Sequence, residues 1–105
     1  MKAPHPSVDL ALRMLKEYPK HDPALIAVES TRVVCLAEQV RRLTELGCKQ
    51  QLTERQDGRL ESLGSRADML LKPYGLSLGN PWGLCFYALP IGHDGSTQNG
   101  CIYLA

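Results

Sequence analysis

The residues whose types suggest catalysis lie close together near the C-terminus. His93, Asp94 and Ser96 fall within four residues of one another, and a histidine, a carboxylate and a hydroxyl are the parts of a hydrolytic triad. Residues this close in sequence rarely orient one another as base and nucleophile, and no G-x-S-x-G elbow is present. The stretch is rich in glycine but holds no lysine, so it is not a phosphate-binding loop. The pattern favours a polar hairpin tip, and we expect no enzymatic activity.

The cysteines do not form a metal-binding pattern. Cys35, Cys48, Cys85 and Cys101 include no C-x-x-C pair and no cluster with histidine, so neither a zinc site nor any cofactor is expected. On one helix Cys35 and Cys48 would lie ~20 Å apart, beyond disulfide reach. No cation neighbours Cys85 or Cys101 in sequence to activate a thiol. The cysteines are expected to be reduced, and these two are expected to act as small buried apolar residues.

Three arginines could contact phosphate groups. Arg55, Arg59 and Arg66 fall roughly on one side of a helix predicted over residues 53–72. Such a stripe is typical of nucleic-acid contacts, so a nucleic-acid-associated accessory module is one alternative function. Four acidic residues interleave with the arginines in the sequence, namely Glu54, Asp57, Glu61 and Asp68. The interleaving favours a solvated face of mixed charge.

Aromatic side chains gather in the last third of the chain. Residues 73–105 contain one charged residue, Asp94, and hold the only tryptophan, the only phenylalanine and three of the four tyrosines. Charge depletion with aromatic enrichment is typical of the centre of a protein interface, and equally of a domain's own core. The candidate partner-binding residues are Trp82, Phe86, Tyr87, Tyr74 and Tyr103. Composition leaves open whether they line an interface or the core.

Two helices are predicted in the first half of the chain. Residues 1–6 are rich in proline and expected to be loose. Apolar residues at i, i+3, i+4 and i+7 then predict a helix over residues 7–18. They are Val8, Ala11, Leu12 and Leu15, while Leu10 and Met14 mark a second apolar face. Asp22 before Pro23 is a strong helix start, and it predicts a second helix over residues 23–46 that Gly47 ends. The alternative is one continuous helix through Gln56 that tolerates Gly47, and a break is favoured.

The second helix carries an apolar seam with a coiled-coil-like period. The seam consists of Ile26, Ser30, Val33, Ala37, Val40 and Thr44, flanked by Leu36 and Leu43. Its spacing of alternating four and three residues buries one side of the helix against another helix. Packing within the chain is favoured, and a homodimer through residues 23–46 is the alternative. On the other side, Glu38 with Arg42 and Arg41 with Glu45 are spaced to form i,i+4 ion pairs.

A third helix and a hairpin complete the chain. Thr53 and Gln56 have capping-box spacing, and an apolar stripe follows to Lys72, so a helix is predicted over residues 53–72. Gly64 lies inside this helix and indicates a close approach of another backbone. Aromatic and apolar residues then predict an antiparallel β-hairpin over residues 84–91 and 101–104, after a short extended piece at Leu76 and Leu78. We therefore expect one α+β domain over residues 1–105.

Charge and hydropathy exclude some environments. The net charge is +1, which provides no global field to recruit nucleic acid or an anionic membrane. No run approaches the ~18 apolar residues of a membrane span, and the N-terminus lacks the apolar core of a signal peptide. We therefore expect a cytoplasmic protein that makes no membrane contact.

The C-terminal part resembles the endings of small phage and prophage accessory proteins of uncharacterised function. Those run from an Arg/Leu-rich helix through a Y-G-L turn to a D-P-x-G strand that ends in tyrosine. Here Y-G-L stands at residues 74–76 and N-P-W-G at residues 80–83, with Asn80 in place of the aspartate and Phe86 before the tyrosine. The resemblance covers about the last 45 residues and carries no catalytic residues. It implies a protein that binds and blocks a host protein in the host cytoplasm, as anti-CRISPR inhibitors do.

The leading hypothesis is thus a small binding protein that occludes a protein partner through its aromatic C-terminal residues. The nucleic-acid module with its arginine face is the second hypothesis. A structural, homo-oligomeric protein is the third.

Overall fold

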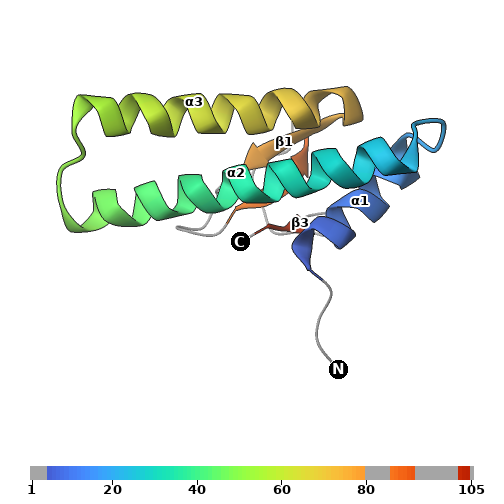
Figure 1. Cartoon of the computed structure of the whole chain (residues 1–105), viewed down its shortest axis with the longest axis horizontal. Helices are drawn as coiled ribbons and strands as arrows, with labels where there is room; N and C mark the ends of the chain where they lie inside the picture. The colour runs from blue at the N-terminus through green and yellow to red at the C-terminus, as the bar shows by residue number, and fades with distance from the viewer. Residues whose placement is uncertain (1–4, 80–85, 92–101, 105) are drawn as a thin grey trace.

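The structure is a computed structural model, and it describes residues 5–79, 86–91 and 102–104. Three helices come first: α1 over Pro6–Glu17, α2 over Pro23–Lys49 and α3 over Glu54–Leu71. A 3-10 turn, η1 over Lys72–Tyr74, leads to strands β1 over Leu76–Gly79, β2 over Tyr87–Pro90 and β3 over Ile102–Tyr103. The predicted α+β fold, with helices before antiparallel strands, is confirmed (Figure 1).

The start signals of α2 and α3 form the caps that the sequence indicates. The Asp22 carboxylate accepts a hydrogen bond from the Ala24 N–H at 3.0 Å and so satisfies a free donor of the first turn. Thr53 and Gln56 form the predicted capping box, with reciprocal hydrogen bonds of 3.2 and 3.0 Å. α1 begins one residue earlier than predicted, because His5 is its cap and a proline fills the first helical position.

The predicted end of α2 at Leu46 is wrong. The helix runs through Gly47 to Lys49, and the Gln50 N–H donates to the Leu46 carbonyl at 3.0 Å. Glycine inside a helix costs about 1 kcal/mol relative to alanine. The added turn offsets this cost through its backbone hydrogen bonds and through Lys49 at the negative end of the helix dipole. α2 and α3 are separate helices, as the sequence favours, but the break falls at residues 50–53.

The strands form one antiparallel sheet in the order β1–β2–β3. Tyr87 lies opposite Gly79 of β1 on one side and opposite Tyr103 of β3 on the other. β2 and β3 are the predicted hairpin in shortened form, and residues 84, 85 and 101 of that prediction lie outside the described residues.

β1 adds a strand where the sequence indicates only an extended piece. Gly75 adopts a left-handed conformation, with φ of 69°, and ends η1 so that the chain turns into β1. The N–H of Ile91 then donates to the Gly75 carbonyl at 2.9 Å. Two strands alone are marginally stable, so the third strand gives the sheet the minimum size for stable packing against the helices.

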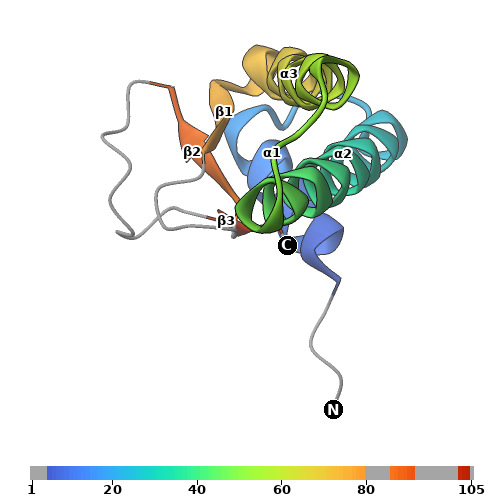
Figure 2. The ribbon, with the colours of Figure 1, turned by 90° about the vertical axis from the view of Figure 1, so that its left-hand side faces the viewer.

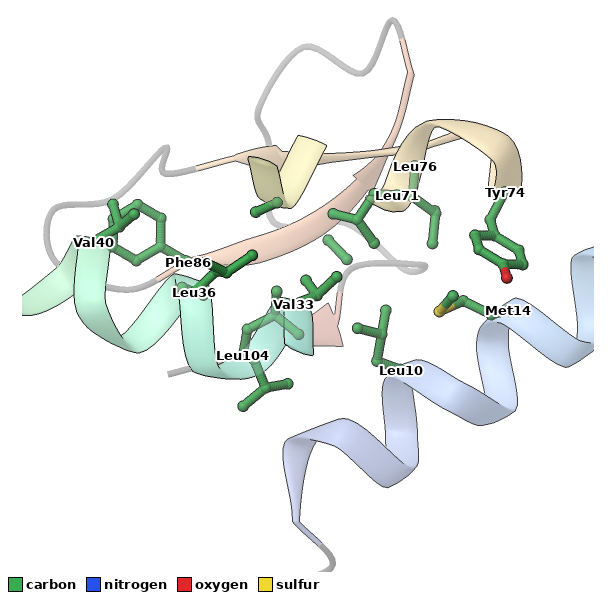
Figure 3. Packing of buried hydrophobic residues seen from close by; sticks show 14 of the residues in the cluster. Leu10, Met14, Val33, Leu36, Val40, Leu71, Tyr74, Leu76, Phe86 and Leu104 are labelled. Atoms are coloured by element: carbon green, nitrogen blue, oxygen red, sulfur yellow. The ribbon is translucent and has the colours of Figure 1, made fainter. Parts of the chain in front are cut away.

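The core lies between α2, α1, α3 and the sheet (Figures 2 and 3). The buried residues of α2 include five of the six seam positions: Ile26, Ser30, Val33, Ala37 and Val40. The Ser30 hydroxyl donates to the Ala27 carbonyl at 3.0 Å, which satisfies the buried polar group. The seam is therefore used within the chain, as the sequence favours, and a homodimer through it would require this core to open.

α3 and α1 each differ in one respect from what their sequences predict. A side chain at Gly64 would meet no described residue within 4 Å, so the described part of the chain shows no close backbone approach at this position. In α1, Leu10 and Met14 are fully buried, whereas Val8 and Leu12 are exposed.

Within the described residues, no helix combines the length and apolar character that crossing a bilayer requires.

Candidate functional site

Two of the five aromatic candidates are buried. Tyr74 and Phe86 belong to the buried core, with 3% and 5% of their surface exposed. Phe86 points toward α2, and Tyr74 points toward α1 (Figure 3). Tyr87 is half-buried in β2, opposite Tyr103 of β3. Trp82 lies outside the described residues. The two buried rings stabilise the domain and offer no contact area to a partner.

Tyr74 is the centre of a small polar cluster at the edge of the core. Its hydroxyl donates a hydrogen bond to the carboxylate of Glu29 on α2. Burial raises the pKa of Tyr74 to about 12, and the hydrogen bond to Glu29 and its charge act in the same direction. The rings of Tyr18 and His21 lie 5.5 and 5.3 Å from the Tyr74 ring, in edge-on and tilted contacts. The cluster ties the α1–α2 connector to α2 and η1.

The charged residues of α3 separate onto two flanks. Arg55, Arg59 and Arg66 are spaced four and seven residues apart, which keeps them on one side of a helix with 3.6 residues per turn. The acidic residues are spaced three, four and seven apart on another side, namely Glu54, Asp57, Glu61 and Asp68. The two sets interleave in sequence but not in space. The mixed-charge face that the interleaving favours is therefore two faces of opposite sign.

Contacts show which way each flank of α3 faces. Arg59 Nη2 donates to Oε1 of Gln39 on α2 at 3.3 Å, so the basic flank faces α2. Asp68 Oδ1 accepts a hydrogen bond from the Leu78 N–H of β1 at 2.6 Å, so the acidic flank faces the sheet. The basic flank thus borders the line along which α2 and α3 run antiparallel, side by side (Figure 1).

A groove follows this line. It has a volume of about 720 Å³ and is lined by Thr31, Arg32, Cys35, Leu36, Gln39, Arg66, Met69 and Leu70. We call this surface the α2–α3 groove. Met69 is 72% exposed, although methionine is an apolar residue. Leu25 and Val28, each 49% exposed, precede Arg32 on the same side of α2 by three- and four-residue steps. Exposed apolar side chains therefore extend the groove toward the start of α2.

The described residues that line the groove carry positive charge and no negative charge. None of its eight described lining residues is acidic. Neither Arg32 nor Arg66 makes an ion pair with a described residue. On α2, by contrast, Arg42 pairs with Glu38 at 2.8 Å and Arg41 with Glu45 at 3.3 Å, as predicted. Within the part of the chain that the structure describes, the groove thus presents two guanidinium groups without an ion-pair partner, beside apolar side chains.

A second, smaller hollow lies at the other side of the core. It has a volume of about 300 Å³ and is lined by Arg13, Tyr18, Tyr74, Gly75, Leu76 and Pro90. The Nε of Arg13 is buried there without a hydrogen-bond partner among the described residues. An unpaired buried donor costs free energy, so Arg13 is a point of strain in the fold.

The remaining predicted candidates are the catalytic-type residues and the cysteines. His93, Asp94 and Ser96 lie outside the described residues, as do Cys85 and Cys101. Cys35 and Cys48 are exposed thiols, and Cys35 lines the α2–α3 groove. Among the residues that the structure describes, no group of three or more His, Cys, Asp or Glu side chains is placed to hold a metal ion.

Sequence reasoning found Arg59 and Arg66 but missed Arg32 and Met69. The available signal was the side of α2 next to the seam, where Leu25, Val28 and Arg32 recur at helical spacing; Glu29 shares this side, and its carboxylate accepts the hydrogen bond from Tyr74. Comparisons of the chain with protein-family models, with curated proteins and with solved structures find no match. The assignment of function therefore rests on the geometry of this site.

Proposed function

We propose that the protein is a small binding protein that acts by occluding a protein partner, and that the α2–α3 groove is its contact surface. The observation that carries this proposal is the 72% exposure of Met69 within a groove of about 720 Å³. An exposed apolar side chain in a concave surface gains free energy when a partner covers it. Methionine also adapts its shape to the surface it contacts, which suits a binding site.

The side chains of the groove are suited to binding. The guanidinium groups of Arg32 and Arg66 carry a positive charge and can donate up to five hydrogen bonds each. They therefore recognise an anionic group rather than transfer protons. Arginine and exposed apolar residues together are the composition enriched at the centre of protein interfaces.

A host protein is the proposed partner because of the resemblance of residues 59–87 to phage accessory proteins. Proteins of that kind commonly act by blocking a host protein, with anti-CRISPR inhibitors as one form. Occlusion requires only a surface that competes for the partner's own binding site.

A matched pair of substitutions tests this surface. Met69→Glu places a charge in the groove, and Leu12→Glu places the same charge on α1, where Leu12 is 61% exposed. Tagged wild-type protein is used to capture partners from a nuclease-treated bacterial lysate, and a partner identified by mass is then purified and titrated. We expect Met69→Glu to weaken binding by at least about tenfold and Leu12→Glu to leave it unchanged. Equal binding by all three proteins, or no captured partner, would contradict the proposal.

A nucleic-acid-associated role is the second candidate, and the separated basic flank favours it. Arg32 and Arg66 line the groove, and Arg55 and Arg59 continue the basic flank of α3. This role predicts binding of a 20-nucleotide single strand that weakens steeply between 50 and 200 mM salt, because released counterions drive such binding. Fluorescence anisotropy at both salt concentrations measures it. The absence of binding at 50 mM salt would remove this candidate.

A further inference from the structure

We propose that the α2–α3 groove receives an amphipathic helix of the partner, with an apolar stripe along one side and acidic residues on both flanks of that stripe. This inference rests on the proposed function and specifies the chemical class of the partner segment. Leu36, Met69 and Leu70 form the apolar part of the groove. Arg32 on α2 and Arg66 on α3 stand on opposite walls.

The shape of the groove fits a helix. Two helices packed side by side leave a furrow along their line of contact, and a third helix fills such a furrow in helical bundles. The lining residues of α2 extend from Thr31 to Gln39, ~12 Å or about two helical turns. Leu25 and Val28 lengthen the apolar stripe to ~21 Å, the length of a helix of about 14 residues. The hydrogen bond from Arg59 to Gln39 joins the two helices at the other end of the stripe.

The walls of the groove disfavour β-strand addition. A strand that adds to a protein needs free backbone N–H and C=O groups on the receiving edge. The groove is bordered by the middle of α2 and by the last turns of α3, where the backbone N–H groups donate within each helix. A bound strand would therefore leave its own backbone groups unpaired at a buried surface. A helix satisfies these groups internally and presents only side chains to the groove.

The charges set the chemistry of the helix. A helix seated between Arg32 and Arg66 has one guanidinium group on each side, so carboxylates on both flanks can form charge-assisted, bidentate pairs. Neither arginine makes an ion pair with a described residue that would have to break first. Nucleic acid fits this surface less well, because Met69, Leu36 and Leu70 would desolvate phosphate groups without replacing their hydration.

Three labelled peptides test the inference by fluorescence anisotropy. The first is an 18-residue helical peptide with leucine at i, i+3, i+4 and i+7 and glutamate on both flanks. The second carries lysine in place of each glutamate, and the third is a scrambled version of the first. We expect the glutamate peptide to bind wild-type protein about tenfold more tightly than either of the others, since two exposed ion pairs and the apolar stripe favour it.

A charge reversal with a matched control locates the site. The double variant Arg32→Glu with Arg66→Glu is expected to reverse the preference, so that the lysine peptide binds more tightly than the glutamate peptide. Lys16→Glu with Lys20→Glu changes the net charge by the same amount at exposed positions of α1 and the connector. This control is expected to keep the wild-type preference. Far-UV circular dichroism and melting of both variants establish that the fold is intact.

Several outcomes would overturn the inference. Equal binding of the glutamate and lysine peptides by wild-type protein would do so, as would a control variant that reverses the preference as the groove variant does. Binding of the 20-nucleotide strand without binding of the glutamate peptide would assign the groove to nucleic acid. A sedimenting dimer that the groove variant abolishes would assign it to a second copy of the chain. If a captured partner depends on Met69 but the glutamate peptide does not bind, the proposed function stands and the acidic helix is wrong.

Discussion

The aromatic C-terminal residues and the arginines of α3 both have the composition of a contact surface, but Tyr74 and Phe86 occupy the opposite environment to Arg66 in the folded chain. Tyr74 and Phe86 are buried in the core, whereas Arg66 lines an exposed groove with Arg32. The difference teaches that composition identifies residues able to make contacts without indicating what they contact. In α3 the helical period indicates which side of the helix carries the arginines. In β2 both alternating sets of side chains are apolar, so the strand period does not indicate which face is buried.

The largest expected effect separates core from groove. Phe86→Ala is expected to lower the free energy of unfolding by about 3–5 kcal/mol, because it leaves a cavity beside α2. Met69→Ala is expected to change it by less than about 0.5 kcal/mol, since the side chain is exposed. Denaturant unfolding measures both. Comparable effects from the two substitutions would remove the distinction between the regions.

The next effect concerns the pH dependence of the core aromatic cluster. The pKa of Tyr74 rises from 10.0 to about 12 on folding, so the unfolded chain loses this proton first as pH increases. Stability should therefore be complete below pH 10 and fall between pH 10 and 12, by on the order of 2 kcal/mol. Unfolding free energies of wild type and Tyr74→Phe over this range measure it. The variant should lack this part of the decline, and identical profiles would count against the buried hydroxyl.

Substitutions of two arginines are expected to have smaller effects, one on stability and the other on binding. Arg13→Met is expected to raise the free energy of unfolding by about 1 kcal/mol, because it removes a buried donor that has no partner among the described residues. Arg66→Met should leave stability within about 0.5 kcal/mol of wild type while weakening binding at the groove. Thermal melts and peptide titrations of both variants distinguish these roles. A marked loss of stability in Arg13→Met would show that its guanidinium is satisfied in solution.

Two glycines are expected to give effects of opposite sign. Gly47→Ala is expected to stabilise the protein by about 0.5–1 kcal/mol, because Gly47 is inside α2 and an added methyl group meets Leu52 at 3.4 Å, an ordinary contact. Gly75→Ala is expected to destabilise by about 1–2 kcal/mol, since its φ is 69° although the space around it is open. Denaturant unfolding of both variants gives the two signs. Destabilisation by Gly47→Ala would restore the predicted helix end at Leu46.

The sequence predicts the helices well because their signals are local. Asp22, Thr53 and Gln56 act within one turn of their own helices, so their caps form as expected. The sequence does not predict β1 as a strand. Its four residues form a strand only because they pair with residues 87–90, and that pairing is not encoded within β1 itself. Helical spacing alone also could not choose between the two apolar faces of α1, of which Leu10 and Met14 form the buried one.

The candidate site was predictable only in part. Arg59 and Arg66 share a side of α3 by spacing alone, but a groove needs a second wall. That wall exists because α2 and α3 run antiparallel, which places Arg32 near Arg66 although 34 residues separate them in sequence. Helical spacing in one element does not specify the neighbouring element, so the partner residues of the groove emerge only from the tertiary structure.

The two charged flanks of α3 have a kinetic consequence. A helix with its side chains is ~10–12 Å across, whereas electrostatic screening at physiological ionic strength acts over about 8 Å. An approaching molecule at the groove therefore meets the basic flank almost alone, although the chain as a whole carries a net charge of +1. Such a local field orients an acidic segment before contact and raises its rate of encounter. Added salt should then lower the association rate constant and leave the dissociation rate constant nearly unchanged. The local field of the basic flank thus orients a binding partner even though the protein is nearly neutral.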